Sequence, residues 1–356
     1  MYLRPTAFVD APFGLDGRVA RLAGGLVWFS AVELIRAEGG RRRSTELVPV
    51  ADLPAAIAGE AAAELAWGRL TAPRAPLVMG ARTVRLDQPQ VMAILNVTPD
   101  SFSDGGRLDG DPAAAADAGV AMAADGAAIV DLGGESTRPG AQPVWEGDEI
   151  ARILPVVERL ARGGVAVSID TRKAGVMAAA LEAGAGLVND VSALGHDDRA
   201  AGVVAQAGCP IVLMHHQGEP QTMQANPRYD DVLLDVYDWL AERIARAEAA
   251  GSERARILID PGIGFGKALR HNLALLNGLA LFHALGCGIV LGASRKRVIG
   301  ALANEAPVEK RLGGSVALAL TGAAQGVQLL RVHDTYETVQ ALRVWRGLRD
   351  AALTGG

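Results

Sequence analysis

The stretch VMAILNVTPDSFSDGG, residues 91–106, decides the fold of this chain. Five apolar residues lead into a run of Asn, Thr, Pro, Asp and Ser that ends in two glycines. A short apolar run without alternation is typical of a strand that is buried on both faces. The stretch therefore predicts a buried strand of a parallel sheet whose carboxyl end opens into a polar loop.

The same unit occurs eight times from residue 91 onward: an apolar run, a polar or glycine-rich break, and a longer segment with helical periodicity. The eight apolar runs are residues 91–95, 128–132, 165–169, 186–188, 210–214, 257–259, 288–291 and 327–330. Alternation of strands with helices predicts an α/β protein with a parallel sheet, and closure into a (β/α)8 TIM barrel leaves no strand edge exposed. An open doubly wound sheet is the alternative.

Several helices have recognisable ends. Asp111 before Pro112 is typical of an N-cap and first turn. Residues 148–162 contain Pro155, which we expect to kink or shorten their helix. Residues 229–249 place their apolar side chains on one helical face, and Gly251 follows as a stop signal.

The first 75 residues do not follow this rhythm. We predict that residues 1–75 form a small N-terminal α+β extension, to which the sequence assigns no role, and that residues 76–356 form the barrel domain. Residues 77–90 alternate and contain a glycine, which predicts a hairpin covering the bottom of the barrel.

Composition limits the class of protein. The 356 residues carry a net charge of -5, so they provide no overall basic field for nucleic acid or for an anionic membrane. Cys209 and Cys287 have no disulfide or zinc spacing and suit a reducing compartment. The chain shows neither a secretion signal nor a membrane-spanning apolar run. We therefore expect a cytoplasmic protein with neither a nucleic-acid nor a membrane partner.

Polar side chains stand directly after nearly every apolar run, where a barrel has its active site. In chain order they are Asn96, Asp131, Asp170, Asn189, His215, Asp260, Ser294, Arg295, Lys296, Arg331 and His333. Amides, carboxylates and cations on one rim predict, from the residues alone, a site for a polar ring and an anion.

Eight segments in this order resemble the motif set of the dihydropteroate synthases: LNVTPDSFSDGG, DLGGESTRPGA, SIDTRK, VNDVSA, LMHHQG, DPGIGFGK, GASRKR and RVHD. The resemblance spans roughly residues 76–345. It implies a (β/α)8 barrel that joins 6-hydroxymethyl-7,8-dihydropterin pyrophosphate to p-aminobenzoate and releases pyrophosphate with the help of Mg2+. It further implies small-molecule substrates, inhibition by sulfonamides and, by analogy, a homodimer.

The resemblance implies that the pterin contacts Asp170, Asn189, Asp260 and Lys296, and Met214 is a candidate to pack against the ring face. The edge of a pterin ring is rich in N–H donors, so carboxylate and amide acceptors of the protein fit this role. Each such group left unpaired in a buried site costs about 1 to 3 kcal/mol. Three alternatives stay open. Asp170 is also a candidate helix N-cap, Asp260 a candidate turn former, and Met214 an ordinary core residue.

For the pyrophosphate, the resemblance implies Asn96, Arg331 and His333, with Asn96 also as a ligand of Mg2+. The two residues on the last strand are two positions apart and project to the same side. Ser294 is a candidate N-cap of a helix that would add N–H donors for an anion. The segment GIGFGK is not a P-loop, because it lacks the first Walker glycine and the final Ser or Thr, so Lys267 is interpreted as structural.

The resemblance also implies that the loops 96–106 and 133–141 close over the bound pterin. Asp104 would stabilise the cationic pterin methylene, and Arg138 would lie against the pterin ring, so that the catalytic set is Asn96, Asp104, Arg138 and Lys296. The walls of the p-aminobenzoate site would be Phe102, Thr137 and Pro139.

Four further residues of these motifs have less certain roles. Glu135 and Asp131 could be functional residues of the site, or they could be acceptors that anchor the loops. Arg297 stands where some members have Ser, so the p-aminobenzoate carboxylate would meet this Arg or a backbone N–H. His216 stands where many members have Met, which leaves the role of its loop open.

Two other functions compete with this interpretation. A pterin-binding methyltransferase domain would share the barrel but would not need the NVTPDSFSDGG loop or the SRK segment. A catalytically silent pterin-binding paralogue is disfavoured by the complete set of polar residues.

Overall fold

The computed structural model describes residues 1–98, 111–135, 144–218 and 223–354. Eight parallel strands close into a barrel in the order β7, β8, β9, β10, β11, β12, β13 and β14, with β14 returning to β7. Their bounds are Gln90–Asn96, Ile129–Gly133, Val167–Asp170, Leu187–Asp190, Ile211–Met214, Ile257–Asp260, Gly288–Leu291 and Leu329–Val332. The predicted TIM barrel is confirmed, and the open sheet is excluded.

Most of these strands reach further toward their carboxyl ends than the apolar runs indicate. β9 includes Asp170, β10 includes Asn189, and β14 includes Arg331. Backbone ladder bonds do not depend on side-chain polarity, and the ladder pairs Asn189 with Asp170 across neighbouring strands. The polar side chains are therefore held by the sheet itself rather than by the loops that follow it.

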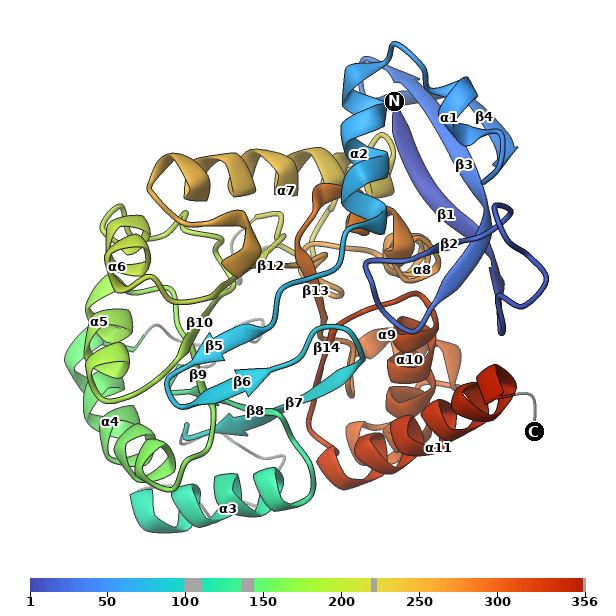
Figure 1. The fold of residues 1–356 in the computed structure, drawn as a ribbon. Helices are drawn as coiled ribbons and strands as arrows, with labels where there is room; N and C mark the ends of the chain where they lie inside the picture. The colour runs from blue at the N-terminus through green and yellow to red at the C-terminus, as the bar shows by residue number, and fades with distance from the viewer. Residues whose placement is uncertain (99–110, 136–143, 219–222, 355–356) are drawn as a thin grey trace.

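Helices surround the barrel, as Figure 1 shows. Their bounds are α3 Pro112–Ala124, α4 Glu146–Arg162, α5 Ala174–Glu182, α6 Ala200–Ala207, α7 Val232–Ala249, α8 Leu269–Asn277, α9 Arg297–Leu302, α10 Leu312–Ala324 and α11 Thr335–Thr354, with 3-10 turns η2 Arg254–Arg256, η3 Leu279–Leu285 and η4 Val308–Lys310. Asp111 caps α3 as predicted, by accepting hydrogen bonds from the backbone N–H groups of Ala113 and Ala114.

Of the two effects expected of Pro155, the shortening of its helix is wrong, and the kink stays a prediction. α4 continues through Pro155 to Arg162. Ile153, Val156 and Leu160 are fully buried on its inner face, and this burial outweighs the lost backbone hydrogen bond.

A hairpin covers the amino end of the barrel, as predicted. Its strands β5, Leu77–Met79, and β6, Arg82–Val84, pair antiparallel. The hairpin lies across the end of the barrel that faces the viewer in Figure 1. Its apolar side chains and Leu86 pack on the first residues of the barrel strands, among them Met92, Ile129, Leu187, Val212, Leu258, Val290 and Leu329.

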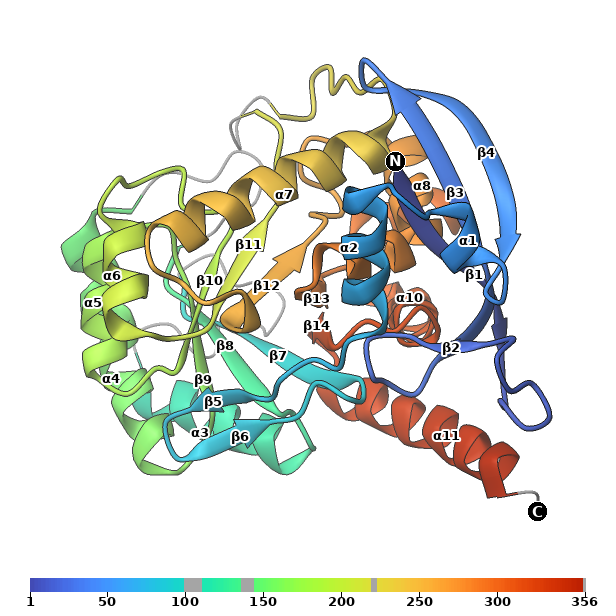
Figure 2. The same ribbon diagram turned by 45° about the horizontal axis from the view of Figure 1, so that its top comes forward.

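The first 75 residues form the predicted α+β extension. Strands β1 (Tyr2–Val9), β2 (Ala20–Arg21) and β4 (Arg41–Pro49) all pair antiparallel with β3 (Trp28–Glu38), and helices α1 (Leu53–Ala56) and α2 (Ala61–Thr71) follow. Figures 1 and 2 show this blue sheet outside the ring of helices, near α8. Its core includes Ala284 of η3, so the extension packs on the barrel domain. The exact domain boundary stays a prediction.

Among the described residues, no helix is both long enough and apolar enough to span a membrane.

Candidate active site

Arg331 lies at the centre of the polar rim. From β14 its Nε donates to Asp131 Oδ2 on β8 at 2.6 Å, and its Nη2 donates to Asp170 Oδ2 on β9 at 2.7 Å. Asn189 on β10 donates from Nδ2 to the same Asp131 oxygen at 3.0 Å. One network therefore joins four strands at the carboxyl end of the barrel.

The two carboxylates of this network are buried and Arg331 is half-buried, which shapes their electrostatics. Burial raises the pKa of Asp170 to about 7, although Arg331 opposes the shift. For Arg331 the effect of burial is to lower the pKa, but Asp131 and Asp170 outweigh it and the pKa is raised. Two carboxylates share a single guanidinium, and that guanidinium holds its proton firmly.

Two oxygens of the network have no hydrogen-bond partner among the described residues. They are Asp131 Oδ1 and Asp170 Oδ1, both buried. A buried acceptor without a donor costs about 1 to 3 kcal/mol. The site is therefore prepared for a ligand that carries N–H or O–H donors.

Asp260 and Lys296 approach the same point of the mouth. The position that a Cβ on Gly292 would occupy is 3.4 Å from Asp260 Oδ2 and 3.8 Å from Lys296 Nζ. Burial raises the pKa of Asp260, opposed by Lys296. Burial, with a smaller contribution from Arg331, lowers the pKa of Lys296 to about 8, and Asp260 opposes this shift. These groups and the Arg331 network thus lie around one mouth.

The other oxygen of Asp260 forms a turn. Its Oδ1 accepts a hydrogen bond from the backbone N–H of Gly262 at 2.7 Å. The turn-forming interpretation of Asp260 is therefore correct for one oxygen, while the second oxygen faces the mouth.

Two N-cap interpretations are wrong. The N-cap residue of α5 is Lys173, so Asp170 does not cap that helix and contacts Arg331 instead. The N-cap residue of α9 is Lys296, and Ser294 Oγ accepts from the backbone N–H of His333 at 3.2 Å. Both helices begin later than the polar clusters suggest.

His333, Asn96 and Met214 also reach this end of the barrel. His333 Nδ1 lies 3.1 Å from Ser294 Oγ. Asn96 ends β7, and its Oδ1 is 3.1 Å from the position of a Cβ on Gly133 of β8. Met214 ends β11, is 4% exposed, and pairs in register with Asp260.

Two other predicted positions lie on less buried segments. Arg297 is exposed as the first residue of α9. His216 is half-buried, with Nδ1 at 3.3 Å from the carbonyl oxygen of Gly218.

Five predicted residues, Phe102, Asp104, Thr137, Arg138 and Pro139, lie outside the described residues. The described positions that flank 136–143 are joined by a buried ionic network. Glu135 Oε1 accepts from the N–H of Val144 at 2.9 Å, and Lys173 Nζ donates to the carbonyl of Val144 and to Glu149 Oε2, both at 2.6 Å. These contacts match the interpretation of Glu135 as an acceptor that anchors its loop.

Asp131 has a more central place in the site than its position in the sequence indicated. Its carboxylate is fully buried at the centre of the network. The signal was present, because a charged residue stands between Val130 and Leu132 inside a buried strand.

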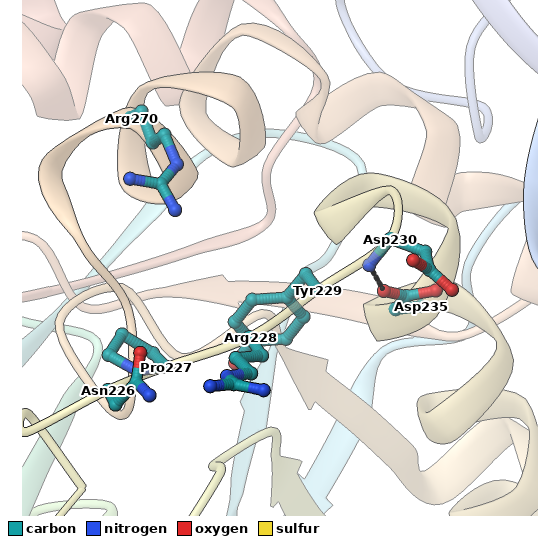
Figure 3. Close-up of a pocket in the computed structure, with 7 residues that line it drawn as sticks. All are labelled: Asn226, Pro227, Arg228, Tyr229, Asp230, Asp235 and Arg270. Carbon is teal, nitrogen blue, oxygen red and sulfur yellow. Dashed lines mark hydrogen bonds between the residues drawn. The ribbon is translucent and has the colours of Figure 1, made fainter.

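A pocket of about 600 Å3 lies elsewhere. Figure 3 shows it between the segment before α7 and the start of α8, where Arg270 stands apart from the other labelled side chains. Its lining residues are Asn226, Pro227, Arg228, Tyr229, Asp230, Asp235 and Arg270. None of them is a strand-end residue, so this pocket is not the candidate active site.

Comparison with known proteins agrees with this geometry. The family described as "Pterin binding enzyme" matches residues 92–333. The dihydropteroate synthase of Escherichia coli strain K12 is 48% identical over 260 residues, covering 73% of this chain and 91% of that protein. The dihydropteroate synthase of Neisseria meningitidis serogroup B is 45% identical over 269 residues, covering 74% and 94%.

Solved structures agree as well. The Yersinia pestis dihydropteroate synthase with a sulfonamide drug complex matches with a TM-score of 0.74 and 44% identity, covering 78% of this chain and all of that one. The Xanthomonas albilineans enzyme with 4-aminobenzoic acid matches with a TM-score of 0.72 and 46% identity, covering 78% and 98%. The same enzyme in complex with 7,8-dihydropteroate matches with a TM-score of 0.69 and 43% identity, covering 77% and 99%.

Proposed function

The chain belongs to the dihydropteroate synthase family of pterin-binding enzymes, and on that premise we propose how its own residues carry the reaction. The chain joins 6-hydroxymethyl-7,8-dihydropterin pyrophosphate to p-aminobenzoate, forms 7,8-dihydropteroate and releases pyrophosphate. The observation that carries the proposal is the buried Arg331 network with its two unpaired carboxylate oxygens.

The pterin ring would bind to the acceptors of this rim. Its amino and ring N–H groups supply the donors that Asp170 Oδ1 lacks, and Asp260 Oδ2 faces the same mouth. Asn189 is held by Asp131, which fixes which way its amide points. A ring whose edge pairs all these groups gains affinity, and a ring without the donors is rejected. Met214, buried at the end of β11, would pack against the ring face.

The diphosphate would lie on the cationic side of the mouth. Arg331 uses two of its N–H donors on carboxylates, and a guanidinium has five, so it keeps donors for a phosphate oxygen. His333 on the same strand end would bind the same group. Lys296 is close to Asp260 and would reach the pterin and border the p-aminobenzoate site.

Mg2+ fits this arrangement through Asn96. The described residues contain no group of three or more His, Cys, Asp or Glu side chains suited to a metal. Mg2+ commonly uses one or two protein oxygens together with substrate phosphates, so the Asn96 amide oxygen at the rim meets the requirement. Bound there, the ion would neutralise charge on the departing diphosphate.

The remaining predicted roles fall on loops outside the described residues. Asp104 would stabilise positive charge at the pterin methylene as pyrophosphate leaves, and Arg138 would lie against the ring. Phe102, Thr137 and Pro139 would form the p-aminobenzoate site, with Arg297 or a backbone N–H at the carboxylate. The amine then attacks the methylene carbon without a covalent enzyme intermediate.

Three further expectations accompany this function: inhibition by sulfonamides, the location in the cell and the oligomeric state. Sulfonamides should compete with p-aminobenzoate, because they bind a related enzyme of similar structure. The cytoplasmic location stays a prediction. The homodimeric state stays a prediction by analogy with the family.

A coupled pyrophosphate assay tests the function. The purified chain, given the pterin pyrophosphate, p-aminobenzoate and Mg2+, should release pyrophosphate only when p-aminobenzoate is present, and mass spectrometry should identify dihydropteroate. Pterin binding without any such release would instead favour the silent paralogue.

Asp260→Asn tests the pterin site. Loss of a buried acceptor charge should weaken binding of the pterin about 100-fold, as measured by calorimetry. Asp190→Asn is the matched control, because Asp190 is a fully buried strand-end carboxylate that bonds Ser192 and Leu194 in its own loop. Wild-type affinity in Asp260→Asn would remove Asp260 from the site.

A further inference from the structure

Two lysines bond to carbonyl groups of the loop after β12, residues 261–267: Lys296 from outside the loop, and Lys267, the last residue of the loop itself. Lys296 Nζ donates to the carbonyl oxygen of Ile263 and lies 4.6 Å from the centroid of the Phe265 ring. Lys267 Nζ donates to the carbonyl oxygen of Phe265 at 3.0 Å. The loop thus connects Lys296, at the mouth, to a second lysine beneath it.

Lys267 is buried without a carboxylate partner within ion-pair distance among the described residues. Its residue is 3% exposed. Three acceptors surround Nζ: His215 Nδ1 at 2.8 Å, the carbonyl oxygen of Phe265, and the carbonyl oxygen of His215 at 3.5 Å. Burial lowers the pKa of Lys267 well below its ordinary 10.5, opposed by Asp260. Burying so polar a group is costly unless it is hydrogen-bonded, and these three contacts satisfy it.

His215 is fixed as the acceptor of this pair. Burial, together with the nearby Lys267, lowers its pKa to about 2, so the ring is neutral. The ring packs edge-on against Trp239, with 4.8 Å between centroids. A neutral imidazole that accepts a hydrogen bond at Nδ1 carries its proton on Nε2.

The pair sits where the loop touches the chain after β11. A Cβ on Gly262 would lie 1.8 Å from the carbonyl oxygen of His215, and one on Gly266 would lie 2.2 Å from that of Gln217. The backbone N–H of His215 also donates to the carbonyl oxygen of Asp260 at 2.9 Å. The loop therefore has no space to shift unless this contact changes.

We propose that Lys267 and His215 are a positioning pair that fixes residues 261–267 and thereby sets Asp260 and Lys296 for the pterin. The inference rests on the proposed function, because it assumes that these two side chains contact the ring. Neither member of the pair needs to touch the substrate. Their effect is transmitted through the carbonyl groups of Phe265 and Ile263, which the two lysines hold.

Lys267→Met tests the proposal, because it keeps the length of the side chain and removes its donors. Calorimetry with 6-hydroxymethylpterin should show binding at least about tenfold weaker than in the unaltered chain, as expected when acceptors and donors at a buried site lose alignment. At saturating pterin pyrophosphate, the KM for p-aminobenzoate should stay within about twofold. If Lys267 were merely structural, its substitution would lower Tm without weakening pterin binding selectively over p-aminobenzoate binding.

Two substitutions at His215 provide a rescue test and cover the case in which Lys267→Met does not fold. His215→Asn places an amide oxygen near the position of Nδ1 and should keep pterin affinity within about threefold, whereas His215→Leu removes the acceptor and should match the loss in Lys267→Met. His283→Asn is the control, since His283 is another fully buried histidine, bonded to the carbonyl of Gln325. It should lower Tm without changing pterin affinity.

The outcomes separate the two proposals. If the unaltered chain fails to bind the pterin, the proposed function fails and this inference fails with it. If the unaltered chain binds and folded Lys267→Met and His215→Leu bind equally well, only the positioning pair is overturned.

Discussion

The two ends of the barrel are built from the same eight strands but differ in chemistry. At the amino end, Leu77, Met79 and Val84 of the hairpin pack on the first residues of the strands. At the carboxyl end, the buried carboxylates of Asp131 and Asp170 share the half-buried Arg331. One end closes by apolar contact, and the other remains open to a ligand.

This difference separates stability from function. Apolar burial at the amino end contributes roughly 25 cal/mol per Å2 and needs no partner outside the chain. The carboxyl end retains two unpaired acceptors and a lysine whose pKa is lowered to about 8 by burial, each of which lowers the stability of the empty fold. These costs are offset elsewhere. Changes at the amino end should therefore alter stability alone, whereas changes at the carboxyl end should alter activity, whatever they do to stability.

The largest expected effect comes from Arg331→Met. Without the guanidinium, two buried carboxylates lose their shared cation, so activity should fall at least about 1,000-fold and the free energy of unfolding by about 3 to 5 kcal/mol. Steady-state kinetics measures the activity, and urea unfolding measures the free energy of unfolding. Arg85→Met is the control at the opposite end, because Arg85 forms an exposed pair with Asp87. An active Arg331→Met variant would contradict the central place of this network.

A smaller effect is expected from pH at Lys296. Its pKa is lowered by burial from the ordinary 10.5 to about 8, opposed by Asp260. Above about pH 8 the folded chain releases this proton first, so the unfolded chain binds more protons and Lys296 makes stability rise with pH up to 10.5. Activity should do the reverse and fall up to about tenfold per pH unit, because the bound substrates need the ammonium.

The kinetic pH profile of kcat/KM, compared with urea unfolding at the same pH values, checks this opposition. Lys296→Arg carries a cation that does not titrate in this range, so its residual activity should lack the decline above pH 8. An unchanged decline in that variant would assign it to another group.

The smallest effect on activity is expected at the hairpin. Leu77→Ala leaves a cavity among fully buried side chains and should lower the free energy of unfolding by about 2 to 4 kcal/mol. Below the unfolding transition, kcat and both KM values should stay within about twofold. A selective rise in the KM for the pterin substrate at unchanged stability would show that the two ends are coupled.

Much of the difference between the two barrel ends was predictable from the order of the residues. The repeated apolar runs predict the barrel, and the residues after them include Asn96, Asp260 and Arg331, which the structure brings to one end. The hairpin was likewise predictable from its alternation. Local signals failed where they competed with packing, as at Pro155, or where a polar residue had two possible partners, as at Asp170 and Ser294.

The sequence by itself determined which residues reach the rim, because side-chain period and strand direction are local properties of the chain. Only the tertiary structure decided which of them pair. Arg331 meets Asp131 and Asp170 across 200 and 161 positions of sequence, and Lys267 meets His215 across 52. Such pairings depend on barrel closure and on distances between strands, neither of which any single segment encodes.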